Sequence, residues 1–313
     1  MPQRENFYSK ILLFGEYALM AGSPALSIPY NSLHGAFAFG KPNGLSGFDS
    51  NSHLKKYAGY LHELSRKADF KGKLNTAELE KDIADGLVFE SNIPLGYGLG
   101  SSGSLVAAVY ERYGMNKIQV EAALSNDKLV VLKQIMAAME SWFHGKSSGL
   151  DPLICYLQKA VMVKGENKLE VVDLPQFKSN TGGAMFLLDT GTTGETQPLV
   201  NYFVNQCEKA DFLDKIKSEL VPLNERCIRA YLSGDTEVLF PCVEKLSAFT
   251  RQYFQPMIPE KVLPVWENGW ENGKYFLKLC GSGGGGMMLG FTPDFEQIKS
   301  ILKAFPIKIV QQF

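Results

Sequence analysis

A glycine-rich segment in the first third of the sequence has the residue types of a phosphate-binding loop. Residues 94–104 read Pro-Leu-Gly-Tyr-Gly-Leu-Gly-Ser-Ser-Gly-Ser and lie between an apolar strand pattern and an apolar helix pattern. Glycines allow tight turns and a close approach of the backbone to a ligand. The free N–H groups and the positive dipole at a helix start favour an anion there. A plain turn that caps a helix is the alternative, and the strand–loop–helix context favours phosphate.

The segment differs from two other phosphate-binding motifs. Gly145-Lys146-Ser147 ends like a Walker A loop, but the position of the required earlier glycine is Glu140. The G-x-G-x-G-S-S spacing also differs from the dinucleotide fingerprint G-x-G-x-x-G, and no acidic residue follows at the expected distance. A different class of phosphate site is therefore indicated.

A second glycine-rich segment, Gly281-Ser-Gly-Gly-Gly-Gly286, connects two predicted strands. A hairpin does not need four consecutive glycines. Flexible connection is one interpretation, and a backbone that lies against a ligand is the other; the conformational freedom of glycine favours the second.

Four charged residues could take part in chemistry, although each also has a structural explanation. Lys10 stands at the start of an apolar strand, and Glu16 follows it across a short turn; taken alone, each resembles a surface charge. Glu140 lies on an otherwise apolar helix face and resembles a partly buried carboxylate. Asp151 precedes a proline just past a helix end, a position typical of a helix N-cap.

Composition excludes several classes of function. The 313 residues include 32 basic and 33 acidic side chains, so the net charge of -1 argues against a nucleic-acid binder. The five cysteines and four histidines show no metal-ligand spacing, which favours free thiols in a reducing compartment. The polar N-terminus and the lack of a long apolar run predict a cytoplasmic protein without membrane association.

The elements that must position these residues mix helices and strands without strict alternation, which favours an α+β fold. A loop is expected at 41–52. If the chain divides into domains, the boundary is expected near residues 155–183, where the signal is weak. Strands are expected at 8–14, 25–29, 35–39, 87–91, 184–189, 275–280, 287–291 and 307–311. Helices are expected at 54–67, from the glycine loop to Gly114, and at 127–144, 213–232, 236–254 and 294–304.

Four segments in order resemble the motifs of the GHMP kinases, and within them the mevalonate kinase subfamily. Residues 10–25 resemble K-x-x-L-x-G-E-H-x-V-x-x-G-x-P-A, and residues 94–103 resemble P-x-G-x-G-L-G-S-S-A. Residues 278–286 resemble K-x-T-G-A-G-G-G-G. Residues 140–151 resemble E-x-x-x-H-G-x-P-S-G-x-D without a gap. The resemblance covers nearly the whole chain, because the motifs run from residue 10 to residue 286.

The resemblance implies a two-domain fold with an active site in the cleft between the domains. Residues 1–155 would form a nucleotide-binding α+β domain, and residues 156–313 a ferredoxin-like α+β domain. It also implies ATP and Mg²⁺ as cofactors, with Ser102 and Glu140 as metal ligands. Asp151 would accept the proton of the acceptor hydroxyl beside Lys10. The nucleotide-binding residues would be Pro94, Gly96, Gly98, Leu99, Gly100, Ser101, Ser102, Gly103, Gly283 and Gly284. The acceptor-binding residues would be Glu16, Tyr17, Ser148, Gly281 and Ser282.

Five positions depart from the family motifs. Tyr17 replaces a histidine, Cys280 a threonine, and Ser282 an alanine; Gly103 and Ser147 replace an alanine and a proline. The first two departures concern the acceptor side, because they change groups expected near the acceptor. The machinery for phosphoryl transfer is retained.

The resemblance therefore predicts an ATP-dependent kinase of isoprenoid biosynthesis that phosphorylates the hydroxyl of mevalonate. Phosphomevalonate, a sugar or another alcohol is the alternative acceptor. An inactive, ligand-binding relative is a second alternative, against which the retained Lys10, Ser102, Glu140 and Asp151 argue. The expected partner is the small-molecule substrate alone, and a homodimer is compatible with the sequence.

Overall fold

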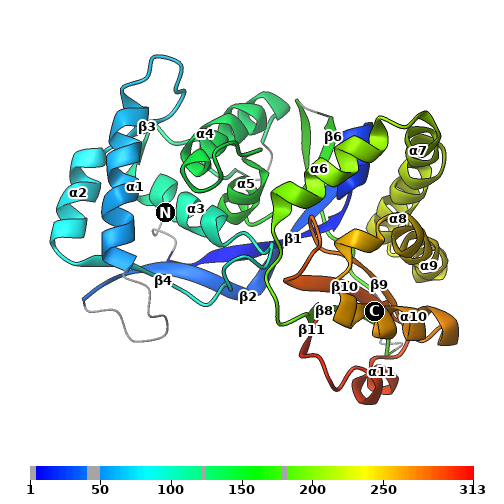
Figure 1. The fold of residues 1–313 in the computed structure, drawn as a ribbon. Coiled ribbons are helices and arrows are strands. Elements are labelled where there is room, and N and C mark those ends of the chain that lie inside the picture. Colours follow the sequence, from blue (N-terminus) through cyan, green and yellow to red (C-terminus); the bar gives the residue numbers. More distant parts are fainter. Residues whose placement is uncertain (1–4, 41–49, 122–123, 166, 178–181) are drawn as a thin grey trace.

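The computed structural model describes residues 5–40, 50–121, 124–165, 167–177 and 182–313. It confirms an α+β architecture with two separate sheets, each accompanied by its own helices (Figure 1). Most of the expected loop at 41–52 lies outside the described residues, and its last residues begin a helix.

The N-terminal half is built on a five-stranded antiparallel sheet. Its order is β1-β2-β6-β7, and β4 pairs with the far end of β2. The strands are β1 (Phe7–Phe14), β2 (Ala25–Phe39), β4 (Leu87–Ser91), β6 (Ala160–Gly165) and β7 (Lys168–Val172). A two-stranded ladder of β3 (Lys73–Leu74) and β5 (Gly114–Met115) lies beside it.

Five helices accompany this sheet, and they gather at one end of the molecule in Figure 1. They are α1 (Ser50–Ser65), α2 (Thr76–Ala84), α3 (Ser101–Tyr113), α4 (Asn126–His144) and α5 (Leu150–Leu157). α3 is deeply buried, because residues 103–110 are all buried. It therefore supplies a rigid base for the glycine-rich loop that precedes it.

The C-terminal half is built on a four-stranded antiparallel sheet with the order β11-β8-β10-β9. Its strands are β8 (Ala184–Asp189), β9 (Phe276–Leu279), β10 (Met287–Thr292) and β11 (Ile307–Gln312). The helical segments are η1 (Tyr17–Ala21), α6 (Thr196–Cys207), α7 (Ala210–Lys215), η2 (Ile216–Leu220), α8 (Val221–Ser233), α9 (Thr236–Tyr253), η3 (Gln255–Met257), η4 (Glu260–Val262), α10 (Leu263–Asn272) and α11 (Phe295–Ile301).

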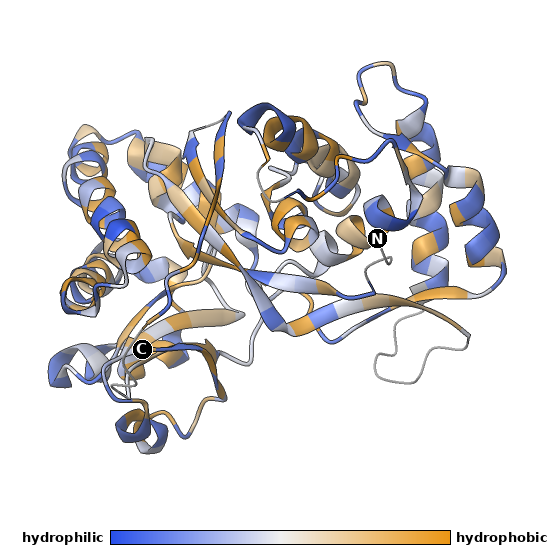
Figure 2. Cartoon of the chain, turned by 180° about the vertical axis from the view of Figure 1, so that it is seen from behind, coloured by the Kyte–Doolittle hydropathy of each residue, from blue (hydrophilic) through white to orange (hydrophobic). Residues whose placement is uncertain are grey.

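β1 and β2 lie between two hydrophobic cores. One core contains the buried side chains of α1 to α5 together with Phe7 and Ala25. The other contains the C-terminal sheet and its helices together with Ile11 and Leu13. In Figure 2 the helices carry both hydrophilic and hydrophobic residues, as expected for helices with one face against a core. Residues of β1 can therefore contact both halves of the molecule.

Most predicted elements are present, although two have different bounds and several described elements, among them α2, α6 and α10, were not predicted. The strands expected at 25–29 and 35–39 form one long strand, β2. The helix expected at 213–232 is divided into α7, η2 and α8, although the path is continuously helical. The hairpin of β6 and β7 was not predicted. It pairs with β2, so this segment belongs to the N-terminal sheet.

The expected division of the chain between residues 155 and 156 stays a prediction. None of the described helices has the length and apolar character needed to cross a membrane.

Candidate functional site

The glycine-rich loop leads directly into α3, whose first residue is Ser101. Gly100 is the N-cap residue, with φ 79° in the left-handed region, and no side chain caps the helix start. The N–H groups of the first turn are therefore available to an anion. The loop is fixed to β1, because the Lys10 N–H donates a 3.0 Å hydrogen bond to the Leu99 carbonyl.

Gly103 allows α3 and α5 to approach each other closely. A Cβ at this position would lie 2.9 Å from the Pro152 nitrogen and 3.0 Å from the Asp151 carbonyl carbon. The family motif has alanine here, so the glycine of this chain accommodates a particularly close contact. It brings the start of α3, the predicted phosphate site, next to the start of α5, which carries Asp151.

Lys10 and Asp151 form an ion pair, with 2.9 Å between Lys10 Nζ and Asp151 Oδ2. The lysine side chain is 6% exposed and the aspartate side chain 36%, so the carboxylate is the more accessible partner. Burial lowers the pKa of Lys10, but the charge and hydrogen bond of Asp151 oppose this, and the net shift of the pKa is upward. Lys10 therefore stays charged beside the carboxylate of Asp151.

Ser102 and Glu140 lie next to each other at the start of α3. The Ser102 hydroxyl donates to Glu140 Oε1 over 2.9 Å and lies 3.1 Å from His144 Nε2. The Ser147 hydroxyl donates to the second oxygen of Glu140. Burial and the negative charge of Asp151 raise the pKa of Glu140 to about 7, although hydrogen bonds from Ser147 and Ser102 act in the opposite direction.

This donor set fits a magnesium ion that is shared with a nucleotide. Mg²⁺ prefers oxygen ligands and is commonly held by one or two carboxylates together with substrate phosphates. Ser102 and Glu140 supply a hydroxyl and a carboxylate beside the N–H groups of α3. The described residues contain no cluster of three or more His, Cys, Asp or Glu side chains for a protein-only metal site.

A second ion pair, between Glu16 and Lys278, joins the first and third motif segments. Lys278 Nζ donates to Glu16 Oε1 and to the Leu279 carbonyl, the latter over 2.6 Å. The Lys278 side chain is 2% exposed and that of Glu16 12%. Burial raises the pKa of Glu16 despite the opposing charge of Lys278. Cys280 lies between the two ion pairs, and burial raises the pKa of its thiol to about 11.

Replacing Lys278 by methionine is expected to destabilise the protein by about 3–5 kcal/mol, because Glu16 would remain buried without its partner. Chemical denaturation would measure the change in free energy of unfolding. The double variant Glu16→Gln, Lys278→Met should recover a large part of the loss. Lys299→Met removes the exposed pair with Glu296 and should change little. If Lys278→Met and Lys299→Met lowered the free energy of unfolding by the same amount, the stabilising role of the buried pair would be contradicted.

Tyr17 lies behind the second glycine-rich loop. Its side chain is 3% exposed and contacts the rings of Phe203 and Phe254 at centroid distances of 4.8 and 5.4 Å. Its hydroxyl donates to the Ser282 carbonyl over 2.8 Å. The Ser282 hydroxyl lies 3.0 Å from that of Thr196 at the start of α6. Two residues that depart from the family motifs therefore bond each other.

The two glycine-rich loops pack against each other. A Cβ at Gly286, where φ is 69°, would lie 2.8 Å from the Cα of Tyr97. A Cβ at Gly98 would lie 3.2 Å from the Cys280 carbonyl oxygen. Part of the glycine run is therefore required by contact between two chain segments, in addition to any contact with a ligand.

Residues predicted from the sequence thus occupy one region. Hydrogen bonds or close approaches join Lys10, Leu99, Gly100, Ser102, Gly103, Glu140 and Asp151 on one side, and Glu16, Tyr17 and Ser282 on the other. Ser148 lies in the turn before α5, where its hydroxyl accepts from the Leu150 N–H at 3.3 Å.

Three residues without a predicted role contact the predicted site residues. Lys278 had a recognisable position, because it begins the third motif. His144 and Ser147 stood in the fourth motif, but only the fold shows that they contact Ser102 and Glu140.

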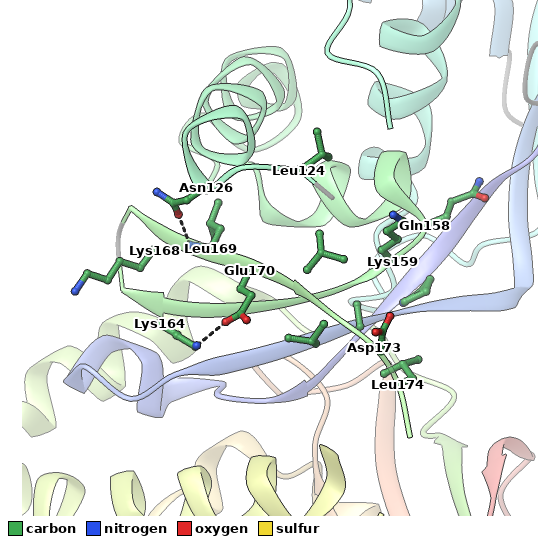
Figure 3. Close-up of a pocket in the computed structure, with 14 residues that line it drawn as sticks. Leu124, Asn126, Gln158, Lys159, Lys164, Lys168, Leu169, Glu170, Asp173 and Leu174 are labelled. Carbon is green, nitrogen blue, oxygen red and sulfur yellow. Dashed lines mark hydrogen bonds and ion pairs between the residues drawn. The ribbon is translucent and has the colours of Figure 1, made fainter. Parts of the chain in front are cut away.

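One groove of the described structure lies away from these residues. It has a volume of about 620 Å³ beside the β6–β7 hairpin, and its lining includes Lys164, Glu170, Asn126 and Leu169 (Figure 3). Two of its polar side chains are paired: Lys164 binds Glu170 at 2.5 Å, and Asn126 accepts from the Leu169 N–H at 2.8 Å. It shares no residue with the predicted site, so we assign it no part in the chemistry.

The geometry places an uncapped helix start, which can bind an anion, in the same region as the ion-paired Asp151. Residues 56–159 match the family model of the GHMP kinases N terminal domain. A mevalonate kinase of Thermococcus sibiricus is 25% identical, covering 91% of this chain and 88% of its own. Residues 56–159 are thus similar to the N-terminal domain of the GHMP kinases, and most of the chain is similar to mevalonate kinases.

Solved structures of the family agree with this fold. The L. major mevalonate kinase in complex with R-mevalonate has a TM-score of 0.67 at 17% identity, covering 100% of this chain and 97% of its own. The Lactococcus lactis galactokinase complexed with galactose has a TM-score of 0.65 at 12% identity, covering 98% and 92%. Because the two scores are nearly equal, fold similarity does not distinguish between acceptors.

Proposed function

We propose that this protein transfers the γ-phosphoryl group of ATP to the hydroxyl of mevalonate. The observation that carries the proposal is the ion pair of Lys10 and Asp151. Asp151 lies in the first turn of α5, and this turn packs closely against Gly103 in the first turn of α3. A phosphate donor on α3 and a hydroxyl beside Asp151 would therefore be neighbours. Similarity to curated mevalonate kinases over 91% of the chain supports mevalonate as the acceptor.

The nucleotide phosphates would lie at the start of α3, against the N–H groups of residues 100–103 and the Ser101 hydroxyl. Ser102 and Glu140 would hold Mg²⁺, which supplies charge neutralisation of the phosphates when it is bound. Ser147 and His144 would orient Glu140 and Ser102 through the hydrogen bonds described above. The raised pKa of Glu140 indicates a carboxylate that gains from a positive neighbour.

Asp151 would orient the acceptor hydroxyl and accept its proton as the new bond forms. The hydroxyl oxygen bonds to the γ-phosphorus, the bond from that phosphorus to the bridging oxygen breaks, and ADP leaves with the electron pair. Because such transition states are loose, orientation contributes as much as proton removal. Lys10 would hold the Asp151 carboxylate in place through the ion pair and offset negative charge on the transferring group.

Glu16, Tyr17, Ser148, Gly281 and Ser282 would shape the acceptor side. Glu16 and Tyr17 act through their partners, because Glu16 binds Lys278 and Tyr17 is buried against the Ser282 peptide. The tyrosine, cysteine and serine that depart from the family motifs cluster here. The acceptor is therefore the part of the proposal that needs a direct test.

A coupled assay of ADP release with Mg²⁺-ATP tests the acceptor against mevalonate, phosphomevalonate, galactose and homoserine. We expect turnover with mevalonate at a kcat/KM at least about 100-fold above the others, as expected when buried polar groups must be matched. Preferred turnover of another alcohol would replace mevalonate by that acceptor. Binding of Mg²⁺-ATP without turnover of any acceptor would favour an inactive relative.

A further inference from the structure

The Ser102 hydroxyl lies between two hydrogen-bond acceptors, although it has one proton to donate. Its oxygen is 2.9 Å from Glu140 Oε1 and 3.1 Å from His144 Nε2. Both residues belong to α4, where they lie one helical turn apart and His144 is the last residue. When the hydroxyl donates to Glu140, the contact with His144 therefore provides a second acceptor that the hydroxyl does not use.

The other carboxylate oxygen of Glu140 is held by Ser147. The Ser147 hydroxyl donates to Glu140 Oε2 and accepts the Gly149 N–H over 2.9 Å, so it is fixed in the turn between α4 and α5. Glu140 Oε1 is consequently the oxygen that faces the start of α3. Its ability to bind a cation depends on where the Ser102 proton points.

The spacing of the Ser102 and Glu140 oxygens fits a shared magnesium ion. Magnesium binds oxygen at about 2.0–2.1 Å in an octahedron, so neighbouring ligand oxygens lie roughly 2.9 Å apart. The Ser102 Oγ to Glu140 Oε1 distance is 2.9 Å, so the two oxygens need little movement to become neighbouring ligands. The proton between them would be repelled by the cation, because the hydrogen of an O–H group is its positive end. It must turn to another acceptor.

We propose that His144 is a positioning residue: its Nε2 accepts the Ser102 proton when the metal binds, which leaves Ser102 Oγ and Glu140 Oε1 free to act as ligands. The O–H bond stays intact and only its direction changes. In this role the imidazole is neutral, with its hydrogen on Nδ1. The inference rests on the proposed metal and nucleotide site, and it adds the residue that lets a hydrogen-bonded pair become a pair of metal ligands.

Two substitutions of His144 separate this role from a merely structural one. In His144→Gln the amide oxygen can occupy the position of Nε2 and accept the same proton. In His144→Asn the side chain is one carbon shorter, so its amide oxygen does not reach Ser102. Both substitutes are neutral amides, and His144 is exposed, so we expect both variants to fold.

Isothermal titration calorimetry with a non-hydrolysable ATP analogue tests the proposal, once with excess Mg²⁺ and once in EDTA without Mg²⁺. With Mg²⁺, we expect the Kd of His144→Asn to be at least about tenfold above wild type, the usual effect of losing a partner of a metal ligand. In EDTA the two Kd values should agree within about twofold, because the phosphates are bound by α3 alone. His144→Gln should stay within about threefold of wild type in both conditions.

His62→Asn is the matched control, because His62 is an exposed histidine on α1 whose Nδ1 lies 3.4 Å from the Thr76 hydroxyl. It should leave both Kd values unchanged. The inference would be overturned if His144→Asn raised the Kd equally with and without Mg²⁺, if it raised neither Kd, or if His144→Gln were as weak as His144→Asn. A wild-type Kd that does not respond to Mg²⁺ would instead overturn the proposed metal site itself.

Discussion

Replacing Asp151 by asparagine is expected to lower kcat roughly 10²–10⁴-fold, the usual contribution of a positioned acid–base group. Asparagine keeps the size of the side chain but can neither accept the hydroxyl proton nor neutralise Lys10. The lysine would be left buried without its partner at 2.9 Å. ATP affinity should change much less than kcat, because Asp151 faces the acceptor. Single-turnover measurements with saturating ATP would give the rate of the chemical step.

Asp173→Asn provides a control for this substitution, because Asp173 is exposed beside the remote groove of Figure 3. It should leave kcat and stability unchanged. Turnover of Asp151→Asn within a few-fold of wild type would remove Asp151 from the mechanism and leave the ion pair with a structural role only.

Replacing Glu140 by glutamine is expected to lower kcat/KM for ATP by about 100-fold or more, since metal-ion stabilisation of phosphoryl transfer is worth several kcal/mol. The amide retains a hydrogen bond with Ser102 or Ser147 but loses the negative charge that a cation requires. The concentration of Mg²⁺ that gives half-maximal rate should rise strongly. A titration of the rate with MgCl₂ at fixed ATP would measure it.

Glu170→Gln is the matched control, because Glu170 is an exposed carboxylate on β7 that pairs with Lys164. Its Mg²⁺ dependence should equal that of wild type. The role of Glu140 would be contradicted by a Glu140→Gln variant with the wild-type Mg²⁺ dependence, even if its overall rate were reduced.

Much of the local structure could be predicted because the motifs carry their own backbone signals. The glycine and serine residues before α3 predict a helix start with free N–H groups, and the structure has α3 begin at Ser101 without a side-chain cap. Asp151 was recognised as a residue of a helix start, and it lies in the first turn of α5.

Other elements were missed because long-range pairing decides them. β2 was predicted as two strands, since the polar residues Asn31 and Ser32 interrupt the apolar pattern. In the sheet the chain continues through them: Tyr8 faces His34 and Ser9 faces Tyr30, so the intervening residues bulge out of the ladder. The β6–β7 hairpin was missed because both of its strands are short and because it is stabilised by the pairing of β6 with β2, which is distant in the sequence.

The side chains that join the two halves could not be predicted from local sequence. Glu16 and Lys278 are 262 residues apart, and Tyr17 and Ser282 are 265 residues apart. Taken alone, Glu16 had the character of a surface charge, yet it forms a buried ion pair. Only the packing of β1 against the C-terminal core brings these segments together.

The most direct test of the central claim follows the phosphoryl group itself. The protein would be incubated with mevalonate and with ATP labelled with ¹⁸O in the γ-phosphate, and the products would be analysed by mass spectrometry. We predict labelled phosphomevalonate and ADP in equal amounts, and at least about 100-fold less of both products with Asp151→Asn over the same time. Formation of ADP with labelled inorganic phosphate and unmodified mevalonate, or no ADP at all, would contradict the account.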